Sequence, residues 1–167
     1  MAVNPSADAA AANANNVNAW LALDHQLCFA LYAASLAMTK TYKPLLAPLG
    51  LTYPQYLALL VLWEADGAGD GLTVSQLGGR LTLDSGTLTP LLKRLDSLGL
   101  VQRRRDNRDE RRVRLHLTTA GRHLKHRAQA VPQAIASATA CNLQQIGDLT
   151  RQLTHLRQQL TSALSHG

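Results

Sequence analysis

Two cysteines, Cys28 and Cys141, carry the most distinctive side-chain chemistry of this sequence. Cys28 falls near the start of a stretch, residues 24–48, in which apolar residues recur at helical spacing. We expect Asp24 to cap this helix and Pro48 to end it. Free backbone N–H groups at a helix start favour an anion, so this position suits an oxidisable thiolate. A cysteine on an apolar helical face is also commonly inert core, and the residues alone leave both interpretations open.

Composition sets broad limits on the fold and on the partners. The chain has 167 residues with 46% apolar content, enough for one domain with a real core. Its net charge of +6 favours a polyanionic partner. No apolar run reaches the length of a membrane span and no signal peptide is evident, so we expect a cytoplasmic protein without a membrane partner. In a reducing cytosol two distant cysteines are either buried thiols or a redox-active pair, not a structural disulfide framework.

A helix-turn-helix is predicted in the middle of the chain. After a helix over 53–65 and a glycine-rich loop, capping signals open a short helix over 73–81 and another over 85–98. Two short helices joined by a tight turn, the second with a polar face, describe this motif. The candidates for contact with DNA phosphates and base edges on that face are Ser85, Thr87, Thr89, Lys93 and Arg94.

A basic β-hairpin is predicted directly after it. Residues 100–105 and 111–117 read as strands, and residues 103–114 contain seven arginines and three acids, a local charge of +4. This hairpin is a wing, and Arg108 at its tip suits insertion into a narrow minor groove, with Arg111 and Arg112 as further DNA-binding candidates. Asp109 is expected to brace a neighbouring arginine.

The remaining segments predict a second helical layer. We expect residues 1–22 to be a mobile tail, 67–118 the winged helix-turn-helix domain, and 23–66 with 119–167 a helical dimerisation region, because the apolar stripes of these helices exceed what a small winged domain covers. The fold class is therefore mainly α with a small β-wing. The spacing of the six histidines matches no metal site, and no motif for a cofactor or for enzymatic catalysis is evident, so we expect a non-enzyme without metal or cofactor.

This order of elements resembles the MarR family of bacterial regulators, and within it the organic hydroperoxide regulators of the OhrR type. The wing signature Asp106-x-Arg108-Asp109-x-Arg111-Arg112, followed by Leu117-Thr118-x-x-Gly121, marks the wider family. The resemblance covers roughly residues 22–165. Segments specific to the subgroup are residues 27–32, 42–46, 49–56 and 83–95.

The resemblance implies a homodimeric repressor that binds double-stranded operator DNA when reduced. It implies that organic hydroperoxides oxidise Cys28, that Tyr42 and Tyr53 hydrogen-bond to its sulfur, and that Cys141 of the other subunit resolves the sulfenic acid as an intersubunit disulfide. Cys28 and Tyr42 lie fourteen positions apart, about 21 Å along a continuous helix, so an antiparallel partner helix would have to bring the tyrosine to the cysteine. The Gly67–Gly71 loop looks longer than is usual in the family.

Two alternatives remain open. The regulator could respond to a small phenolic or other ligand, with Cys28 incidental to the signal. The chain could instead be a thiol peroxidase, although an enzyme has no use for a hairpin with a local charge of +4.

Overall fold

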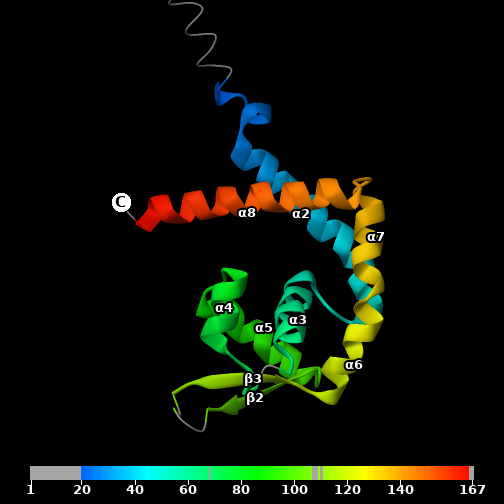
Figure 1. The fold of residues 1–167 in the computed structure, drawn as a ribbon, viewed down its shortest axis with the longest axis vertical. Coiled ribbons are helices and arrows are strands. Elements are labelled where there is room, and N and C mark those ends of the chain that lie inside the picture. The colour runs from blue at the N-terminus through cyan, green and yellow to red at the C-terminus, as the bar shows by residue number, and fades with distance from the viewer. Residues whose placement is uncertain (1–19, 68, 107–108, 110, 166–167) are drawn as a thin grey trace, which may run out of the picture. The chain divides into compact units, whose positions relative to one another are not determined.

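The computed structural model describes residues 20–67, 69–106, 109 and 111–165 (Figure 1). The chain divides into two compact units, residues 1–40 and 41–167. The predicted class, mainly α with a small sheet, is confirmed. The elements in chain order are η1 (Leu23–His25), α2 (Leu27–Leu46), η2 (Ala47–Leu49), α3 (Tyr53–Ala65), β1 (Leu72–Thr73), α4 (Val74–Leu81), α5 (Ser85–Ser97), β2 (Val101–Arg105), β3 (Val113–Leu117), α6 (Thr119–Ala128), α7 (Ala130–Ala138) and α8 (Leu143–Ser165).

Side-chain caps start helices α3 and α4 of the unit 41–167 where the sequence predicts. Before α3, the N–H of Thr52 donates to Gln55 Oε1 at 2.9 Å. Before α4, the N–H of Gln76 donates to Thr73 Oγ1 at 3.2 Å, and the N–H of Thr73 donates to Gln76 Oε1 at 2.8 Å. Each such pair satisfies backbone donors that a helix start leaves without a partner.

The recognition-helix candidate α5 begins at a third cap. The N–H of Thr87 donates to Asp84 Oδ1 at 2.9 Å. This hydrogen bond from the Thr87 backbone, with a second from its hydroxyl, lowers the pKa of the Asp84 carboxyl. The chain leaves α5 through Gly99, whose φ of 68° is the left-handed conformation that glycine adopts without a steric cost.

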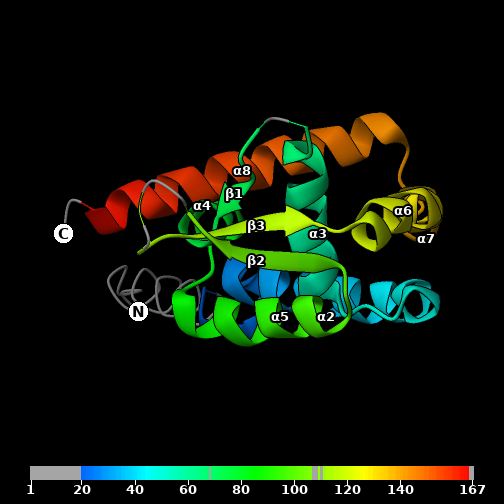
Figure 2. The same ribbon diagram turned by 90° about the horizontal axis from the view of Figure 1, so that it is seen from below.

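A three-stranded antiparallel sheet has β3 between β1 and β2 (Figure 2). Val101 pairs with Leu117 at one end of the hairpin, and Arg105 pairs with Val113 at the other. The two-residue strand β1 was not predicted, because a segment that short has no periodicity. It pairs Leu72 with Leu115 and thereby ties the start of α4 to the wing.

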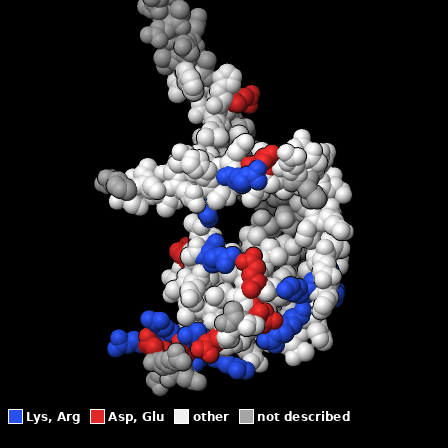
Figure 3. Space-filling view, viewed as in Figure 1, with Lys and Arg blue, Asp and Glu red and all other residues white. Residues whose placement is uncertain are grey.

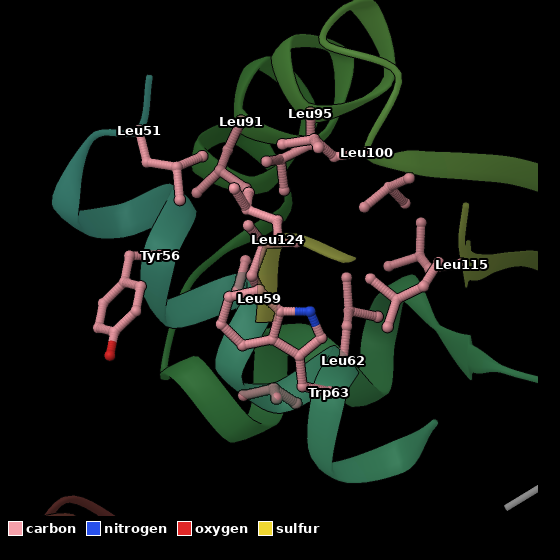
Figure 4. Close-up of a cluster of buried hydrophobic side chains, with 14 of the residues drawn as sticks. Leu51, Tyr56, Leu59, Leu62, Trp63, Leu91, Leu95, Leu100, Leu115 and Leu124 are labelled. Carbon is pink, nitrogen blue, oxygen red and sulfur yellow. The ribbon is translucent and has the colours of Figure 1, made fainter. Parts of the chain in front are cut away.

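The core of the unit 41–167 lies between α3, α4, α5, α6 and the sheet (Figure 4). Leu59, Leu77 and Leu95 have no exposed surface, and burying one such side chain contributes about 1.5–3 kcal/mol. Trp63 lies among them and its Nε1–H donates to the carbonyl of Gly121 at 2.8 Å. A Cβ on Gly121 would lie 2.2 Å from the carbonyl oxygen of Leu100, so only glycine lets α6 pass over the start of β2.

The helical segment after the wing breaks near Pro132. Helix α6 ends at Ala128, and α7 begins two residues later with Pro132 in its first turn. Proline has no N–H and its ring collides with the carbonyl four residues earlier, so the helix cannot run straight through. Asn142 and Gln145 then form a capping box at the start of α8, with N···O distances of 2.9 and 2.8 Å.

The predicted helix start at Asp24 is wrong. Asp24 lies in the short 3-10 helix η1, and α2 begins at Leu27. Gln26, between them, has an extended backbone and donates from its side-chain amide to the carbonyl of Trp20. Residues 20–25 therefore form turns of their own, and Cys28 is the second residue of α2. Of the predicted tail 1–22, residues 1–19 lie outside the described residues, and Trp20 with Leu21 is helical.

Large exposed apolar side chains gather in two segments. Among the described residues they lie in 20–36 and 149–164: Trp20, Leu21, Leu23, Leu27, Tyr32, Leu36, Leu149, Leu153, Leu160 and Leu164. The prediction places α3 in the dimerisation region, which ends at residue 66. In the structure α3 contacts α4, α5 and β3, which the prediction places in the winged domain. The division into winged and dimerisation regions stays a prediction, since dimerisation needs a second chain.

Within the described residues, none of the helices taken singly is long and apolar enough to cross a membrane. The segments Leu27–Leu49 and Tyr53–Ala65 pass that test only as a pair bent by 70°.

Candidate functional sites

Both cysteines are free thiols at least partly open to solvent as residues. Cys28 is exposed in the first turn of α2, and Cys141 is half-buried in the connection between α7 and α8. Neither forms a disulfide within the chain. Ala140, directly before Cys141, has a φ of 52°, a conformation that residues other than glycine rarely adopt. The chain thus turns sharply where Cys141 is presented.

The two predicted tyrosines lie together. The ring centroids of Tyr42, from the end of α2, and Tyr53, from the start of α3, are 4.5 Å apart. Burial, then the neighbouring Tyr53 and Tyr56, raises the pKa of Tyr42 to about 12. Burial also raises the pKa of Tyr53. Both hydroxyls therefore keep their protons at neutral pH and can donate hydrogen bonds to an anion.

Two further aromatic residues, Tyr56 and Trp63, belong to this cluster and were not predicted. The ring of Tyr56 lies 5.8 Å from that of Tyr42 and 6.3 Å from that of Trp63. In Figure 4 the Tyr56 hydroxyl points away from the buried leucines. The spacing of Tyr53 and Tyr56, one turn apart on α3, was the available signal. The cluster links the tyrosine pair to the winged-helix core.

The five predicted contact residues of α5 all face solvent, while the leucines of the same helix are buried. Two of the hydroxyls are engaged within the helix. That of Thr87 donates to Asp84 Oδ2 at 2.9 Å, and that of Thr89 donates to the carbonyl of Ser85 at 2.8 Å. Ser85, Lys93 and Arg94 therefore present the more available polar groups.

The wing is partly described. Arg108, predicted at its tip, lies outside the described residues. Arg111 and Arg112 are exposed, and Asp109 pairs with Arg112 at 3.0 Å, as expected for a brace. Asp109 Oδ1 also accepts a hydrogen bond from the N–H of Arg111 at 3.1 Å. Figure 3 shows Lys and Arg side chains gathered over the wing with acidic side chains beside them.

A buried ion pair in the wing escaped prediction. The Asp106 side chain is 6% exposed and its Oδ2 lies 2.5 Å from Arg114 Nε. Arg114 also donates to the carbonyl of Gly71 at 3.2 Å, which ties the glycine-rich loop to β3. Arg114 is thus a structural residue whose charge is neutralised. No sequence signal separates it from the other arginines of the hairpin.

Comparison with known proteins identifies the chain. Residues 40–128 match the SarA/Rot family of transcriptional regulators. The chain is 50% identical over 138 residues to the HTH-type transcriptional regulator TtmR of Methylorubrum extorquens, covering 83% of this chain and 69% of that protein. The chain belongs to this family of MarR-like winged-helix regulators.

One relative is named for hydroperoxide resistance, and another has been solved in reduced and disulfide forms. The regulator is 55% identical over 113 residues to the organic hydroperoxide resistance transcriptional regulator of Bacillus subtilis, covering 68% of this chain and 74% of that one. This identity supports the predicted OhrR type. AbfR of Staphylococcus epidermidis has been solved reduced and bound to DNA, at 32% identity and a TM-score of 0.67, covering 85% of this chain and 94% of AbfR. Its disulfide form matches at 38% identity and a TM-score of 0.57, covering 86% and 98%.

Proposed function

We propose that this regulator is a redox-sensing repressor. Its reduced homodimer binds double-stranded operator DNA in the cytoplasm, and oxidation of Cys28 by an organic hydroperoxide releases the DNA. The observation that carries the proposal is the tyrosine pair: the ring centroids of Tyr42 and Tyr53 lie 4.5 Å apart, and the raised pKa of each keeps its hydroxyl protonated. Two adjacent phenol donors stabilise a thiolate, which is the form of cysteine that attacks a peroxide.

The proposed sensor site needs two chains. Helix α2 is continuous from Leu27 to Leu46, so the fourteen positions from Cys28 to Tyr42 span about 21 Å. An antiparallel α2 of the partner would bring its tyrosines to Cys28. The exposed apolar residues of 20–36 and 149–164 supply the surface that such a dimer would bury.

The chemistry proceeds in two balanced steps. The Cys28 thiolate attacks one peroxide oxygen, the O–O bond breaks, and the alkoxide leaves as the alcohol after taking a proton, which gives Cys28 sulfenic acid. Cys141 of the partner subunit then attacks that sulfur, a disulfide forms and water leaves. One peroxide thus accepts two electrons from two thiols. The disulfide pulls the dimer helices together and changes the spacing of the two winged units.

DNA release follows from that spacing. In the reduced dimer α5 enters the major groove, with Ser85, Thr87, Thr89, Lys93 and Arg94 as the contact residues. The wing reaches the flanking minor groove with Arg108, Arg111 and Arg112. Dimeric helix-turn-helix proteins need their two recognition helices about one DNA turn apart, so a changed spacing lowers operator affinity.

A mobility-shift experiment tests the proposal. The probe is the duplex of about 30 base pairs that the reduced wild type selects from a random pool, long enough for two half-sites. One equivalent of cumene hydroperoxide should release the wild type from this probe, and dithiothreitol should restore binding. Cys28→Ser should stay bound throughout.

Intact mass and a non-reducing gel on the same samples identify the chemistry. The wild type should give a disulfide-linked dimer, and Cys141→Ser should stop at an oxidised Cys28 without one. The proposal fails if Cys28 stays reduced while DNA binding responds to another compound, such as a phenol.

A further inference from the structure

A cavity of about 510 Å³ lies between the start of α4 and the wing. Arg103 lines it from β2, Arg111 and Arg112 line it from the turn before β3, and Thr73 and Ser75 line it from the end of β1 and the start of α4. We call Ser75 and these three arginines the arginine cradle. Thr73 is left out because its hydroxyl is engaged with Gln76.

The arginine cradle carries excess positive charge. Arg112 pairs with Asp109, but their side chains are 63% and 41% exposed. An ion pair this exposed to solvent contributes little free energy. In the part of the chain that the structure describes, Arg103 and Arg111 form no ion pair. Guanidinium groups match the geometry of a phosphate and bind it with two hydrogen bonds. A singly charged phosphodiester is the anion that such a cavity suits.

Strand geometry explains why Arg103 belongs to the arginine cradle and Arg104 does not. Arg103 pairs with Leu115 and Arg104 pairs with Arg114, so the two arginines lie on opposite faces of the sheet. Leu115 is buried in the core, and Arg103 extends that face toward α4. Arg104 instead donates to Gln102 Oε1 at 2.8 Å on the other face. Arg103 and Arg104 therefore have the same charge but lie on opposite faces of the sheet.

We propose that the arginine cradle holds one phosphate of the DNA backbone in each subunit, and this inference rests on the proposed function. In a helix-turn-helix the first helix, here α4, crosses the backbone while the second lies in the major groove. A wing in the adjacent minor groove places the same backbone strand between α4 and the wing. Arg103 and Ser75 thereby join the DNA-contacting residues, and the wing anchors through β2 as well as through its turn.

The salt dependence of DNA affinity tests this inference. Each phosphate contact contributes about 0.9 to the slope of log K against log salt concentration. In reduced protein with the selected duplex, Arg103→Ala should therefore lower the slope by about 2 per dimer, because a dimer loses two contacts. Base preference should be unchanged, since a phosphate contact carries no sequence information. Arg104→Ala is the matched control and should leave the slope within about 0.5 of the wild type.

Arg103→Lys should keep most of the slope, because lysine also binds phosphate as a point charge. Arg103 is exposed, so its variants should melt like the wild type. Equal slopes for Arg103→Ala and Arg104→Ala, whether both fall or neither does, would overturn the arginine cradle. So would a changed base preference in Arg103→Ala, which would assign Arg103 to a base.

Free inorganic phosphate is the alternative ligand that would bind the arginine cradle by the same chemistry as a DNA phosphate. Calorimetric binding of inorganic phosphate that Arg103→Ala abolishes, without a change in the DNA slope, would also overturn the inference. A wild type that selects no duplex contradicts the proposed function itself. A wild type that binds DNA and releases it on oxidation, with an unchanged slope in Arg103→Ala, contradicts the arginine cradle alone.

Discussion

The winged-helix core and the segments 20–36 and 149–164 differ in how much apolar surface a single chain buries. Leu59, Leu77 and Leu95 are fully enclosed by other elements of their own chain. Leu27, Leu153 and Leu160, with the same side chain, are 59%, 49% and 56% exposed. The core is thus complete in one chain. The other segments have helical structure without burial, which helices of globular proteins rarely keep alone.

The difference in burial between the two regions corresponds to a difference in proposed role, DNA binding for one and redox sensing for the other. We infer that the complete core provides a rigid frame for α5 and the wing. The incomplete segments hold Cys28 and flank Cys141, so the proposed redox chemistry is located where the chain needs a partner. A sensor built from two chains can transmit oxidation as a change in the dimer instead of unfolding the DNA-binding frame.

The largest expected effect is on the core. Leu59→Ala should lower the free energy of unfolding by about 2–5 kcal/mol, because it opens a cavity among packed side chains. Leu164→Ala, at a position that is 85% exposed, should change it by less than about 0.5 kcal/mol. Urea unfolding followed by circular dichroism measures both. Equal losses would break the contrast between the two regions.

A negative charge among the exposed leucines of α8 should dissociate the proposed dimer without unfolding the winged-helix core. Leu153→Asp should raise the dissociation constant of the dimer by about a hundredfold or more, because a carboxylate would be buried at the interface. Gln158→Asp, on the opposite side of α8, should leave the dimer intact. Light scattering across a dilution series reads out the mass. A Leu153→Asp protein that stays dimeric would place the interface elsewhere.

Loss of one phenol should slow the sensor without unfolding it. Tyr42→Phe should reduce the rate of Cys28 oxidation by roughly ten- to a hundredfold, because a hydrogen bond to a charged group contributes about 1.5–3 kcal/mol. The ring remains, so its packing on Tyr53 and the melting temperature should persist. The decay of free thiol after mixing with cumene hydroperoxide gives the rate. A wild-type rate in Tyr42→Phe would remove the tyrosine pair from the mechanism.

The smallest expected effect is on alkaline titration. The pKa of Tyr42 is raised from 10.0 to about 12, so the folded protein keeps a proton that the unfolded chain loses. This contribution to stability is present below pH 10 and is lost as the pH rises toward 12. Tyr53→Phe should lower the pKa of Tyr42, because it removes one electrostatic cause of the shift. Phenolate absorbance, with Tyr42→Phe as the blank, reports the titration.

Local signals explain how much of the fold was predictable. The caps at Thr52, Thr73 and Asp84 lie within three residues of their partners, so the helix starts could be read from the sequence. The leucine stripe of α5 and the alternation in β3 likewise depend on neighbours in sequence. Family resemblance then supplied the pairing of Tyr42 with Tyr53, which periodicity alone leaves open.

Features that depend on distant residues were missed. Strand β1 exists because Leu72 meets Leu115, forty-three positions away, and the buried Asp106 pairs with Arg114, which also donates to the carbonyl of Gly71. The start of α2 was misplaced because Asp24 has the composition of a cap but lies in η1, which the turns of residues 20–25 create. Composition cannot reveal any of these packing events.

A mixed-dimer experiment tests the central claim, that the redox site joins two chains, most directly. Differently tagged Cys28→Ser and Cys141→Ser proteins are reduced, mixed to exchange subunits, treated with one equivalent of cumene hydroperoxide and run on a non-reducing gel. Each protein alone has only one of the two cysteines. The expected product is a disulfide-linked heterodimer containing both tags. A wild type that forms its disulfide within one chain, with no linked species in the mixture, would contradict it.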